Sequence, residues 1–371
     1  MSKVAGHCAL VVVSPVPWFP LQGLIRKLHP GYRPQPDLVE EQNGITVYFP
    51  RFLALPGIGR ALDGFFMAIC SLPVVLKLKN KSAVNLIDAH FAYPDGYAAS
   101  WLGLWLKLPM TITLRGTELP LSKIPGRRRR MLSALARAAR VFSVSESLKT
   151  HLVGLGADTN KIRVVGNGVD TTKFFPIDKA QARKALNIAA DAQVLISVGG
   201  LVDRKGFHRV LEILPDLKNN HSRLLYLIVG GASPEGDIKA RLVAQVEALG
   251  LTADVRFLGA MASDRLYQVL SAADVFVLAT ANEGWANVFL EAMACGLPVV
   301  TTDVGGNREV VCSGDLGIVV RFGDRQALQD AVDAALATNW NREAIIEYAR
   351  QNSWDGRVEI LLSEFNNLVN V

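Results

Sequence analysis

Short runs of apolar, β-branched residues alternate along the whole chain with stretches of helical periodicity. Five such runs come first, at residues 9–13, 45–49, 84–90, 110–114 and 140–144, and six follow, at residues 194–200, 224–231, 255–259, 275–279, 297–302 and 317–322. Amphipathic stretches such as residues 96–106 and 127–140 lie between them. Strands that are apolar on both faces and alternate with helices predict parallel sheets covered by helices on both sides.

A turn-rich segment separates the two series of strands. NGVDTTKFFP, at residues 167–176, contains Asn-Gly and ends in Pro, which is typical of a loop. A chain of 371 residues is long enough for two domains of ordinary size. We therefore expect doubly wound α/β domains at residues 1–168 and 169–352, and a final helix at residues 353–371 that packs back on the first domain. Ligands of such sheets bind beyond the carboxyl ends of the strands, here in a cleft between the two sheets.

The cysteine content and the apolar segments indicate a cellular location. The four cysteines are scattered without C-x-x-C spacing, which predicts reduced thiols and neither a disulfide framework nor a zinc site. The apolar run near the N-terminus reads as a first buried strand, and residues 65–78 are shorter than the roughly 20 residues that span a bilayer. We therefore expect a cytoplasmic protein without a transmembrane helix.

The positive charge of the chain lies in its first half. Residues 1–170 hold 21 Lys and Arg against 10 Asp and Glu, and the remainder holds 19 against 24. Arg127–Arg130 are the densest basic run, and Arg137 and Arg140 follow on what is predicted to be the same helix. Such a face predicts either contact with anionic lipid headgroups or an ordinary solvated surface. Nucleic acid is not indicated, because no aromatic residues interleave the run.

The segment SVGGLVDRKGF, at residues 197–207, passes from a strand through Gly199 and Gly200 and the cations Arg204 and Lys205 into a helix. Glycines let backbone N–H groups approach an anion, and a helix N-terminus beside a lysine favours a diphosphate. Glycine at a strand end is equally consistent with ordinary turn chemistry. The spacing matches neither a P-loop nor the dinucleotide fingerprint, so neither an NTPase nor an NAD enzyme is indicated.

The segment EGWANVFLEAMACGLPVVT, at residues 283–301, places one carboxylate in a loop and a second on the helix that follows. Glu291 lies about one turn into that helix. An ionised carboxylate at Glu291 suits the two hydroxyls of a ribose, and Glu283 with the backbone amides of residues 284–288 suits sugar hydroxyls and phosphate oxygens. The alternative interpretation is that Glu291 complements the helix dipole and that Glu283 is a solvated turn residue.

These segments together, with DVGGNREVV at residues 303–311 and the linker GNGVDTTKFFP, resemble the retaining glycosyltransferases of family 4. The likeness covers about residues 85–355. It implies the GT-B architecture, in which two Rossmann-like domains face each other across a cleft. It also implies that Glu283 contacts the donor sugar, Glu291 the nucleotide ribose and Lys205 the donor diphosphate. The other donor-binding residues that it implies are Gly199, Gly200, Arg204, Met261 near the base, Gly284, Trp285, Asn287 and Val288.

The sequence departs from the family's pattern on both the donor and the acceptor side. The family has an arginine where this chain has Gly200, so either Arg204 replaces that arginine or phosphate binding is weaker. RGTE, at residues 115–118, stands where many members have His-Gly-x-Asp, which makes Arg115 a candidate for contact with an anionic acceptor or the leaving phosphate. His90 is either an acceptor-side residue or part of ordinary strand-end packing.

The resemblance implies a retaining hexosyltransferase that moves a sugar from a nucleotide-sugar to a glycan or lipid-linked glycan in polysaccharide synthesis. Its catalytic candidates are Glu283, Lys205, His90 and Arg115. The sequence contains no Asp-x-Asp, so we expect no metal, and no cofactor besides the nucleotide-sugar co-substrate, with positive charge stabilising the departing diphosphate. The expected location is the cytoplasm, with peripheral attachment to the inner face of the membrane if the basic face contacts lipid headgroups. The alternatives are a nucleotide-sugar epimerase of similar build and a non-catalytic nucleotide-sugar-binding partner.

Overall fold

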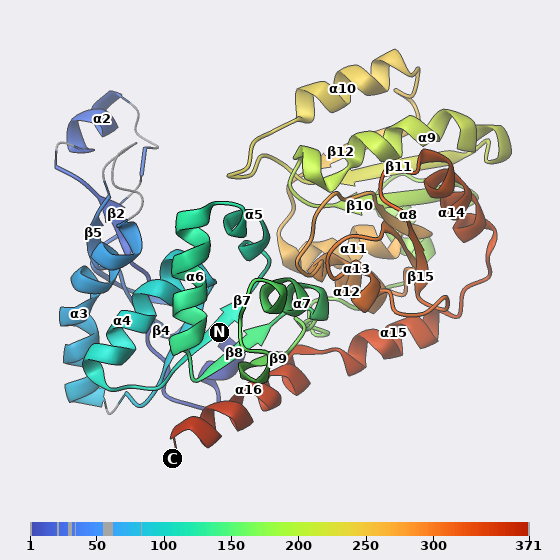
Figure 1. Ribbon diagram of the computed structural model, residues 1–371. Helices are drawn as coiled ribbons and strands as arrows, with labels where there is room; N and C mark the ends of the chain where they lie inside the picture. The colour runs from blue at the N-terminus through green and yellow to red at the C-terminus, as the bar shows by residue number, and fades with distance from the viewer. Residues whose placement is uncertain are drawn as a thin grey trace. The chain divides into compact units, whose positions relative to one another are not determined.

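A computed structural model of the chain describes residues 2–20, 22–28, 32–33, 35–54, 62–82 and 84–369 (Figure 1). The chain forms two compact α/β units. The first holds Met1–Gly166 and Val358–Val371, and the second holds Asn167–Arg357. This boundary lies close to residue 168, at which the sequence predicts the end of the first domain.

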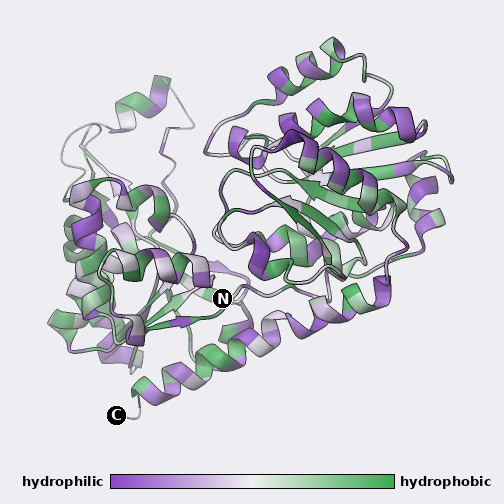
Figure 2. Cartoon of the chain, turned by 45° about the vertical axis from the view of Figure 1, so that its right-hand side comes forward, coloured by the Kyte–Doolittle hydropathy of each residue, from purple (hydrophilic) through white to green (hydrophobic). Residues whose placement is uncertain are grey.

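The second unit is built on one sheet of six parallel strands. Its strands lie in the order β12-β11-β10-β13-β14-β15. They are β10 (Gln193–Val198), β11 (Leu224–Val229), β12 (Val255–Gly259), β13 (Val275–Leu278), β14 (Val299–Thr302) and β15 (Gly317–Val320). Each coincides with one of the six apolar runs of the second half, so the strand predictions for this half are confirmed. Figure 2 shows these strands as mostly hydrophobic along their length.

Helices cover both faces of this sheet. In β10, Val194 and Ile196 belong to the apolar cluster on one face, and Leu195 belongs to the cluster on the other. Burying each such side chain contributes about 1.5–3 kcal/mol, which explains why the strand is apolar at almost every position. On the first face lie α8 (Lys179–Ala185), α11 (Leu266–Ser271), α12 (Asn287–Ala294), α13 (Asn307–Val310) and α15 (Arg342–Gln351); on the second lie α9 (Phe207–Asn220), α10 (Lys239–Ala248) and α14 (Arg325–Ala337).

The first unit contains a parallel sheet of four strands and two smaller sheets. The four strands, in order, are β6 (Ile87–His90), β7 (Met110–Leu114), β8 (Arg140–Ser143) and β9 (Ile162–Val164). The smaller sheets are formed by β1 (Val12–Val13), β4 (Ile45–Tyr48) and β3 (Val39–Gln42), and by β2 (Val16–Trp18) and β5 (Arg51–Leu53). Strand β3 runs antiparallel to β4 at an exposed edge, and its polar sequence VEEQ carries no apolar pattern that would predict a strand.

The helices in residues 2–154 of the first unit are α1 (Ser2–Ala5), α2 (Gln22–Leu28), α3 (Asp63–Ser82), α4 (Tyr97–Leu106), α5 (Glu118–Ser122), α6 (Pro125–Arg137) and α7 (Glu146–Gly154). The apolar residues 65–78 lie in α3, with Pro73 inside the helix. Met67 and Val75 of α3 pack with Leu102 and Leu106 of α4 in a shared apolar cluster. Within the described ranges, no helix combines the length and the apolar character that crossing a bilayer requires.

The basic run of the first unit lies on α6, and this helix ends earlier than expected. Arg137 is its last residue, and Arg140 opens strand β8. The expectation that Arg140 shares a helix with Arg127–Arg130 is therefore wrong. The helix ends because Ala138 has extended backbone angles and the Ala139 N–H donates to the Met110 carbonyl of β7, at 2.9 Å, as the chain enters the sheet.

The two ends of the second unit lie side by side. The Val169 N–H donates to the Asn352 carbonyl and the Trp354 N–H donates to the Val169 carbonyl, each at 3.1 Å. A Cβ on Gly168 would lie 2.5 Å from the Trp354 nitrogen, so only glycine allows this approach. The chain thus enters and leaves the second unit at one place.

Helix α16 (Trp354–Val369) follows this crossing, and its later part belongs to the first unit. The carboxylate of Glu364, which is 7% exposed, forms an ion pair with Arg163 and lies 2.8 Å from Arg140 Nε. The Phe365 ring meets the Phe142 ring edge to face, with centroids 5.9 Å apart. One buried carboxylate therefore joins the last helix to the starts of β8 and β9.

We expect Glu364→Ala to lower the free energy of unfolding of the first unit by about 1–3 kcal/mol, because two arginines lose a buried partner. Glu359→Ala is the matched control, since Glu359 is exposed on the same helix. Urea unfolding followed by circular dichroism measures both variants. Equal stability of the two variants would show that Glu364 does not hold the helix.

Candidate active site

The strand order of the second unit changes direction between β10 and β13. In open α/β sheets ligands bind at such a switch point, beyond the carboxyl ends of the strands. Gly199 and Gly200 follow β10 at this point, and Glu283 lies in the loop that follows β13. The fold therefore brings together two segments that the sequence separates by about eighty residues, as the pairing of Leu195 with Val275 shows.

The carboxylate of Glu283 is surrounded by three polar side chains and is only 8% exposed. Lys205 Nζ lies 2.6 Å from Glu283 Oε1, and Arg204 Nη1 lies 3.2 Å from the same oxygen. The Thr280 hydroxyl lies 3.2 Å from this oxygen and 2.9 Å from the Arg204 carbonyl, and its single proton serves one of them at a time. The interpretation of Glu283 as a solvated turn residue is therefore wrong.

Two glycines allow the loops to approach this closely. Gly206 has a φ of +77°, and a Cβ there would lie 1.9 Å from the Ala279 carbonyl oxygen. Gly305 has a φ of +52°, and a Cβ there would lie 1.6 Å from the Glu283 carbonyl oxygen. Any other residue would push the loops apart. The position of Lys205 beside Glu283 therefore depends on these glycines.

Glu291 lies in the middle of α12 and is the fifth residue of this helix, which starts at Asn287. Burial raises the pKa of Glu291 to about 7, while the positive charge of Lys205 acts in the opposite direction. The helix dipole acts mainly on the first turn, so it does not account for this position well. A ligand whose hydroxyls donate to the carboxylate favours the ionised form, and its binding is therefore linked to release of a proton near neutral pH.

The other donor-side candidates lie around the same edge of the sheet. Gly284 and Trp285 are in the loop before α12, and Val288 is the second residue of that helix. Met261, after β12, packs with Trp285 and Val288 against the apolar cluster below. The side-chain oxygen of Asn287 accepts a hydrogen bond of 2.8 Å from the Asn167 amide. Of these residues, Asn287 is the exposed one.

Arg204, rather than a residue at position 200, supplies the second cation beside Glu283. A Cβ on Gly200 would lie 3.1 Å from the Ser233 Cβ, so a larger side chain there would displace Ser233. Arg204 also binds Glu235, in the loop after β11. The sequence analysis did not identify Glu235 or Thr280. Both follow strand ends at the ligand-binding edge, and that position is the signal that indicates them.

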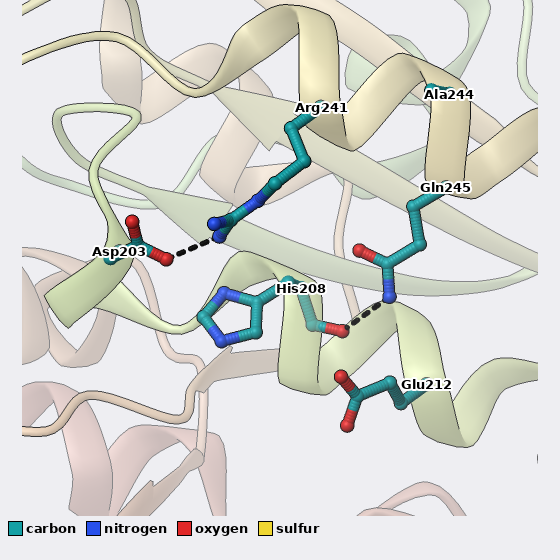
Figure 3. A pocket seen from close by; sticks show the side chains of 6 residues that line it. All are labelled: Asp203, His208, Glu212, Arg241, Ala244 and Gln245. Carbon is teal, nitrogen blue, oxygen red and sulfur yellow. Dashed lines mark hydrogen bonds and ion pairs between the residues drawn. The ribbon is translucent and has the colours of Figure 1, made fainter.

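A pocket of about 530 Å³ lies on the other side of the turn that carries these cations, between α9 and α10 (Figure 3). It is lined by Asp203, His208, Glu212, Arg241, Ala244 and Gln245. Asp203 forms an ion pair with Arg241, and the Gln245 amide donates to the His208 carbonyl at 3.0 Å. Burial, together with Arg209 and Arg241, lowers the pKa of His208. The polar groups of this pocket thus fasten the turn at residues 203–205 to α10.

In the first unit, the structure brings His90 and Arg115 together. Arg115 Nε and Nη2 lie 3.1 and 2.8 Å from His90 Nδ1. Arginine has only donors, so Nδ1 accepts and the ring proton is on Nε2, which lies 3.4 Å from Asp88 Oδ2. Burial lowers the pKa of Arg115, while Asp88 and Glu118 act in the opposite direction. The ring of His90 is therefore oriented from both sides.

Glu118 organises the loop that carries Arg115. Its carboxylate is fully buried and accepts hydrogen bonds from the N–H groups of Ala92 at 3.0 Å, Arg115 at 3.3 Å and Gly116 at 2.8 Å. Three backbone donors satisfy a buried carboxylate well. Glu118 thus has a structural role, and the half-buried Arg115 and His90 are the candidates in this group for contact with a ligand.

Two glycosyltransferase family models match successive parts of the chain. The profile described as Glycosyltransferase Family 4 matches residues 28–173, and the profile described as Glycosyl transferases group 1 matches residues 178–352. The chain belongs to glycosyltransferase family 4. The resemblance drawn from residues 85–355 is confirmed, and each unit of this family-4 chain corresponds to one of the two profiles.

The relatives of this family-4 chain include glycosyltransferases. The D-inositol 3-phosphate glycosyltransferase of Actinosynnema mirum is 36% identical over 244 residues, which are 62% of this chain and 58% of that protein. The protein of the same name from Corynebacterium urealyticum is 35% identical over 242 residues, covering 62% of this chain and 57% of that protein. The chain thus spans little more than half the length of these relatives.

Solved structures share the fold of this family-4 chain. Sucrose-phosphate synthase from Thermosynechococcus elongatus has a TM-score of 0.75 at 22% identity, covering 97% of this chain and 96% of that one. Anabaena HepE in complex with UDP has a TM-score of 0.74 at 22% identity, covering 86% of each chain. The expected GT-B fold, with two Rossmann-like units, is confirmed.

The raised pKa of Glu291 predicts a pH-dependent stability. The unfolded state ionises from about pH 4.5 and the folded state only near pH 7, so the folded state binds more protons between these values and loses stability as the pH rises through them. Relative to Glu291→Gln, we expect the wild type to lose on the order of 3 kcal/mol of unfolding free energy across this window.

Urea unfolding at intervals from pH 4 to pH 8 measures this difference. Glu247→Gln, at an exposed position on α10, is the matched control and is expected to follow the wild type. A wild type and a Glu291→Gln variant that stay parallel over the whole range would contradict the raised pKa.

Proposed function

We propose that the protein is a retaining, metal-independent glycosyltransferase that moves a hexose from a nucleotide-sugar to a glycan or lipid-linked glycan acceptor. One observation carries the proposal: Lys205 and Arg204 flank the buried carboxylate of Glu283 at the switch point of a doubly wound sheet, beside Glu291 on α12. This arrangement offers two cations to a diphosphate and two carboxylates to sugar hydroxyls.

In the proposed complex, each donor-side residue has one task. Glu291 holds the ribose, Lys205 and Arg204 hold the diphosphate, and Glu283 orients the transferred sugar. The leaving diphosphate gains negative charge as the glycosidic bond to it breaks, and two fixed cations stabilise that charge without a metal. The acceptor hydroxyl then attacks from the same face of the sugar, with the leaving phosphate accepting its proton. His90 and Arg115 are proposed on the acceptor side, where Arg115 suits an anionic group.

Features of the similar proteins support a nucleotide-sugar donor. Anabaena HepE, which has this fold, has been solved with UDP and with UDP-glucose. Two relatives that are 36% and 35% identical are D-inositol 3-phosphate glycosyltransferases. The role in polysaccharide synthesis and the cytoplasmic location remain part of the proposal.

Product analysis distinguishes this function from its two rivals. Incubation with UDP-, GDP- and ADP-sugars and a glycan or lipid-linked acceptor is expected to give free nucleoside diphosphate and a new α-linked glycoside in equal amounts. An epimerase releases the nucleotide without a glycosidic bond. A non-catalytic nucleotide-sugar-binding subunit is stabilised by the donor, by roughly 2.7 kcal/mol at 100 times its Kd, yet turns over nothing. Either result would refute the transferase.

The two carboxylates are expected to differ in their effects on binding and turnover. Glu291→Gln should weaken nucleotide-sugar and free nucleoside diphosphate alike by about tenfold, because a charge-assisted hydrogen bond to the ribose is lost. Glu283→Gln should lower turnover by about 100-fold while free nucleotide binding stays within about threefold. Calorimetry and initial rates test both variants. Unchanged nucleotide affinity in Glu291→Gln would contradict its assignment to the ribose.

The first unit is proposed to contact an anionic membrane surface through α6 and α4. Arg128 and Arg129 are exposed on α6, and Arg137 stacks on Trp101 of α4 with 4.4 Å between its guanidinium carbon and the ring centroid. Leu104 and Trp105 of α4 are 60% and 38% exposed. Exposed apolar and aromatic side chains beside arginines suit the interface of a bilayer. Arg140 has no part in this surface, because it is paired with Glu364.

Sedimentation with vesicles tests the membrane contact. Arg128→Gln with Arg129→Gln is expected to reduce binding to anionic vesicles several-fold, since each arginine contributes about 1 kcal/mol near the surface. Binding should fade between 0.1 and 1 M salt, as the Debye length falls from about 10 Å to about 3 Å. The matched control, Arg265→Gln with Arg321→Gln, removes two exposed charges from the second unit. Equal binding to neutral and anionic vesicles would refute the proposal.

A further inference from the structure

The turn at residues 203–205 carries three consecutive charged side chains, and each forms an ion pair. Asp203 pairs with Arg241 of α10 (Figure 3) and Lys205 pairs with Glu283. Arg204 forms the third link, a pair with Glu235, in addition to its contact with Glu283. The first two partners fix the turn in the fold. The third partner, Glu235, binds the guanidinium of Arg204, which is the cation to which a diphosphate is proposed to bind.

Arg204 and Glu235 form a two-point ion pair. Arg204 Nε lies 2.6 Å from Glu235 Oε2, and Nη2 lies 2.7 Å from Oε1. Arg204 holds the pKa of Glu235 below its usual range, and Glu235 raises the pKa of Arg204. This fork-to-fork geometry uses the same edge of the guanidinium that binds two oxygens of a phosphate group. A diphosphate and Glu235 therefore compete for one edge of Arg204.

Glu235 is presented by a tight turn that is independent of the Glu283 loop. Ser233 and Gly236 exchange two backbone hydrogen bonds of 2.9 Å, and the Glu235 N–H donates to the Ser233 hydroxyl at 3.2 Å. The Ser233 side chain lies against Gly200, where a Cβ would be 3.1 Å away. The glycine at position 200 and the carboxylate at position 235 are thus parts of one arrangement, which leaves Arg204 as the second cation of the site.

The charges around the site alternate and cancel. Glu235, Arg204, Glu283 and Lys205 form a row of two carboxylates and two cations joined by ion pairs. Glu283 is fixed, because it is 8% exposed and lies within hydrogen-bond distance of Thr280. The Glu235 side chain is 52% exposed. Glu235 is therefore the carboxylate that can leave its partner for water at small cost.

We propose that Glu235 is a built-in competitor of the donor diphosphate for Arg204, and that it sets how tightly the protein binds a nucleoside diphosphate. Donor binding exchanges one anion for another on Arg204, and release of product restores the pair. The cost of this exchange weakens binding of every ligand that carries a diphosphate and leaves the nucleoside part unaffected. This inference rests on the proposed function, because it takes the diphosphate to lie at Arg204 and Lys205.

The test is the affinity of Glu235→Gln for UDP, for inorganic pyrophosphate and for uridine, measured by calorimetry at 0.05 and 0.5 M salt. We expect UDP and pyrophosphate to bind about three- to fivefold more tightly than to the wild type at low salt, and the gain to shrink at high salt. Uridine affinity should not change. Glu247→Gln, which removes an exposed carboxylate from α10, should give no gain for any of the three ligands.

A double-mutant cycle separates competition from a general change in charge. In an Arg204→Gln background, Glu235→Gln is expected to have no effect on UDP affinity, because the contested cation is gone. A weaker affinity of Glu235→Gln for UDP would overturn the proposal, since it would show that Glu235 holds Arg204 in its binding position. A gain no larger than that of Glu247→Gln would overturn it as well.

The failure of the proposed function looks different from either of these results. If the proposed function is wrong, the wild type binds neither UDP, GDP and ADP nor their sugars. That result would refute both the donor site and the competing role of Glu235. A wild type that binds a nucleoside diphosphate while Glu235→Gln gains nothing leaves the proposed function intact and removes only the role of Glu235.

Discussion

Strands β10 and β13 pair in the middle of the second unit's sheet, where Leu195 lies opposite Val275 and Ile196 opposite Phe276. The loops after these two strands carry Lys205 and Glu283, and no local interaction in the sequence would bring them within 2.6 Å. The buried faces of the sheet supply the free energy that holds the strands in register. The geometry of the charged group is therefore a consequence of the apolar packing beneath it.

The loops themselves add little flexibility to this arrangement. The Ala281 N–H donates to the Arg204 carbonyl at 2.7 Å, which joins the two loops through their backbones. Fixed charges stabilise a developing charge without the cost of reorganising in the reaction, which suits the metal-independent transfer that we propose. The same rigidity makes the exposed Glu235 turn the part of the site that can adjust to a ligand.

The sequence predicted most of the second unit because its strands are buried on both faces. Residues 255–259 were predicted as a strand and form β12 with the same bounds. Edge strand β3 was missed, because an exposed polar strand has no periodic apolar pattern. The end of α6 was misplaced because hydrogen bonds to β7, which are not local, decide where the helix stops. The sequence predicted Arg204, Lys205 and Glu283 as site residues. The contacts that Thr280 and Glu235 make with them depend on tertiary structure alone.

The crossing of the chain at Val169 and Ser353 has a consequence for biosynthesis. The second unit lies within the first unit in sequence, because residues 358–371 complete the first. During translation, the whole second unit emerges from the ribosome before Glu364 is available to Arg140 and Arg163. The first unit is therefore the first to be started and the last to be completed. Any release of the chain before residue 358 leaves these two arginines without their buried carboxylate partner.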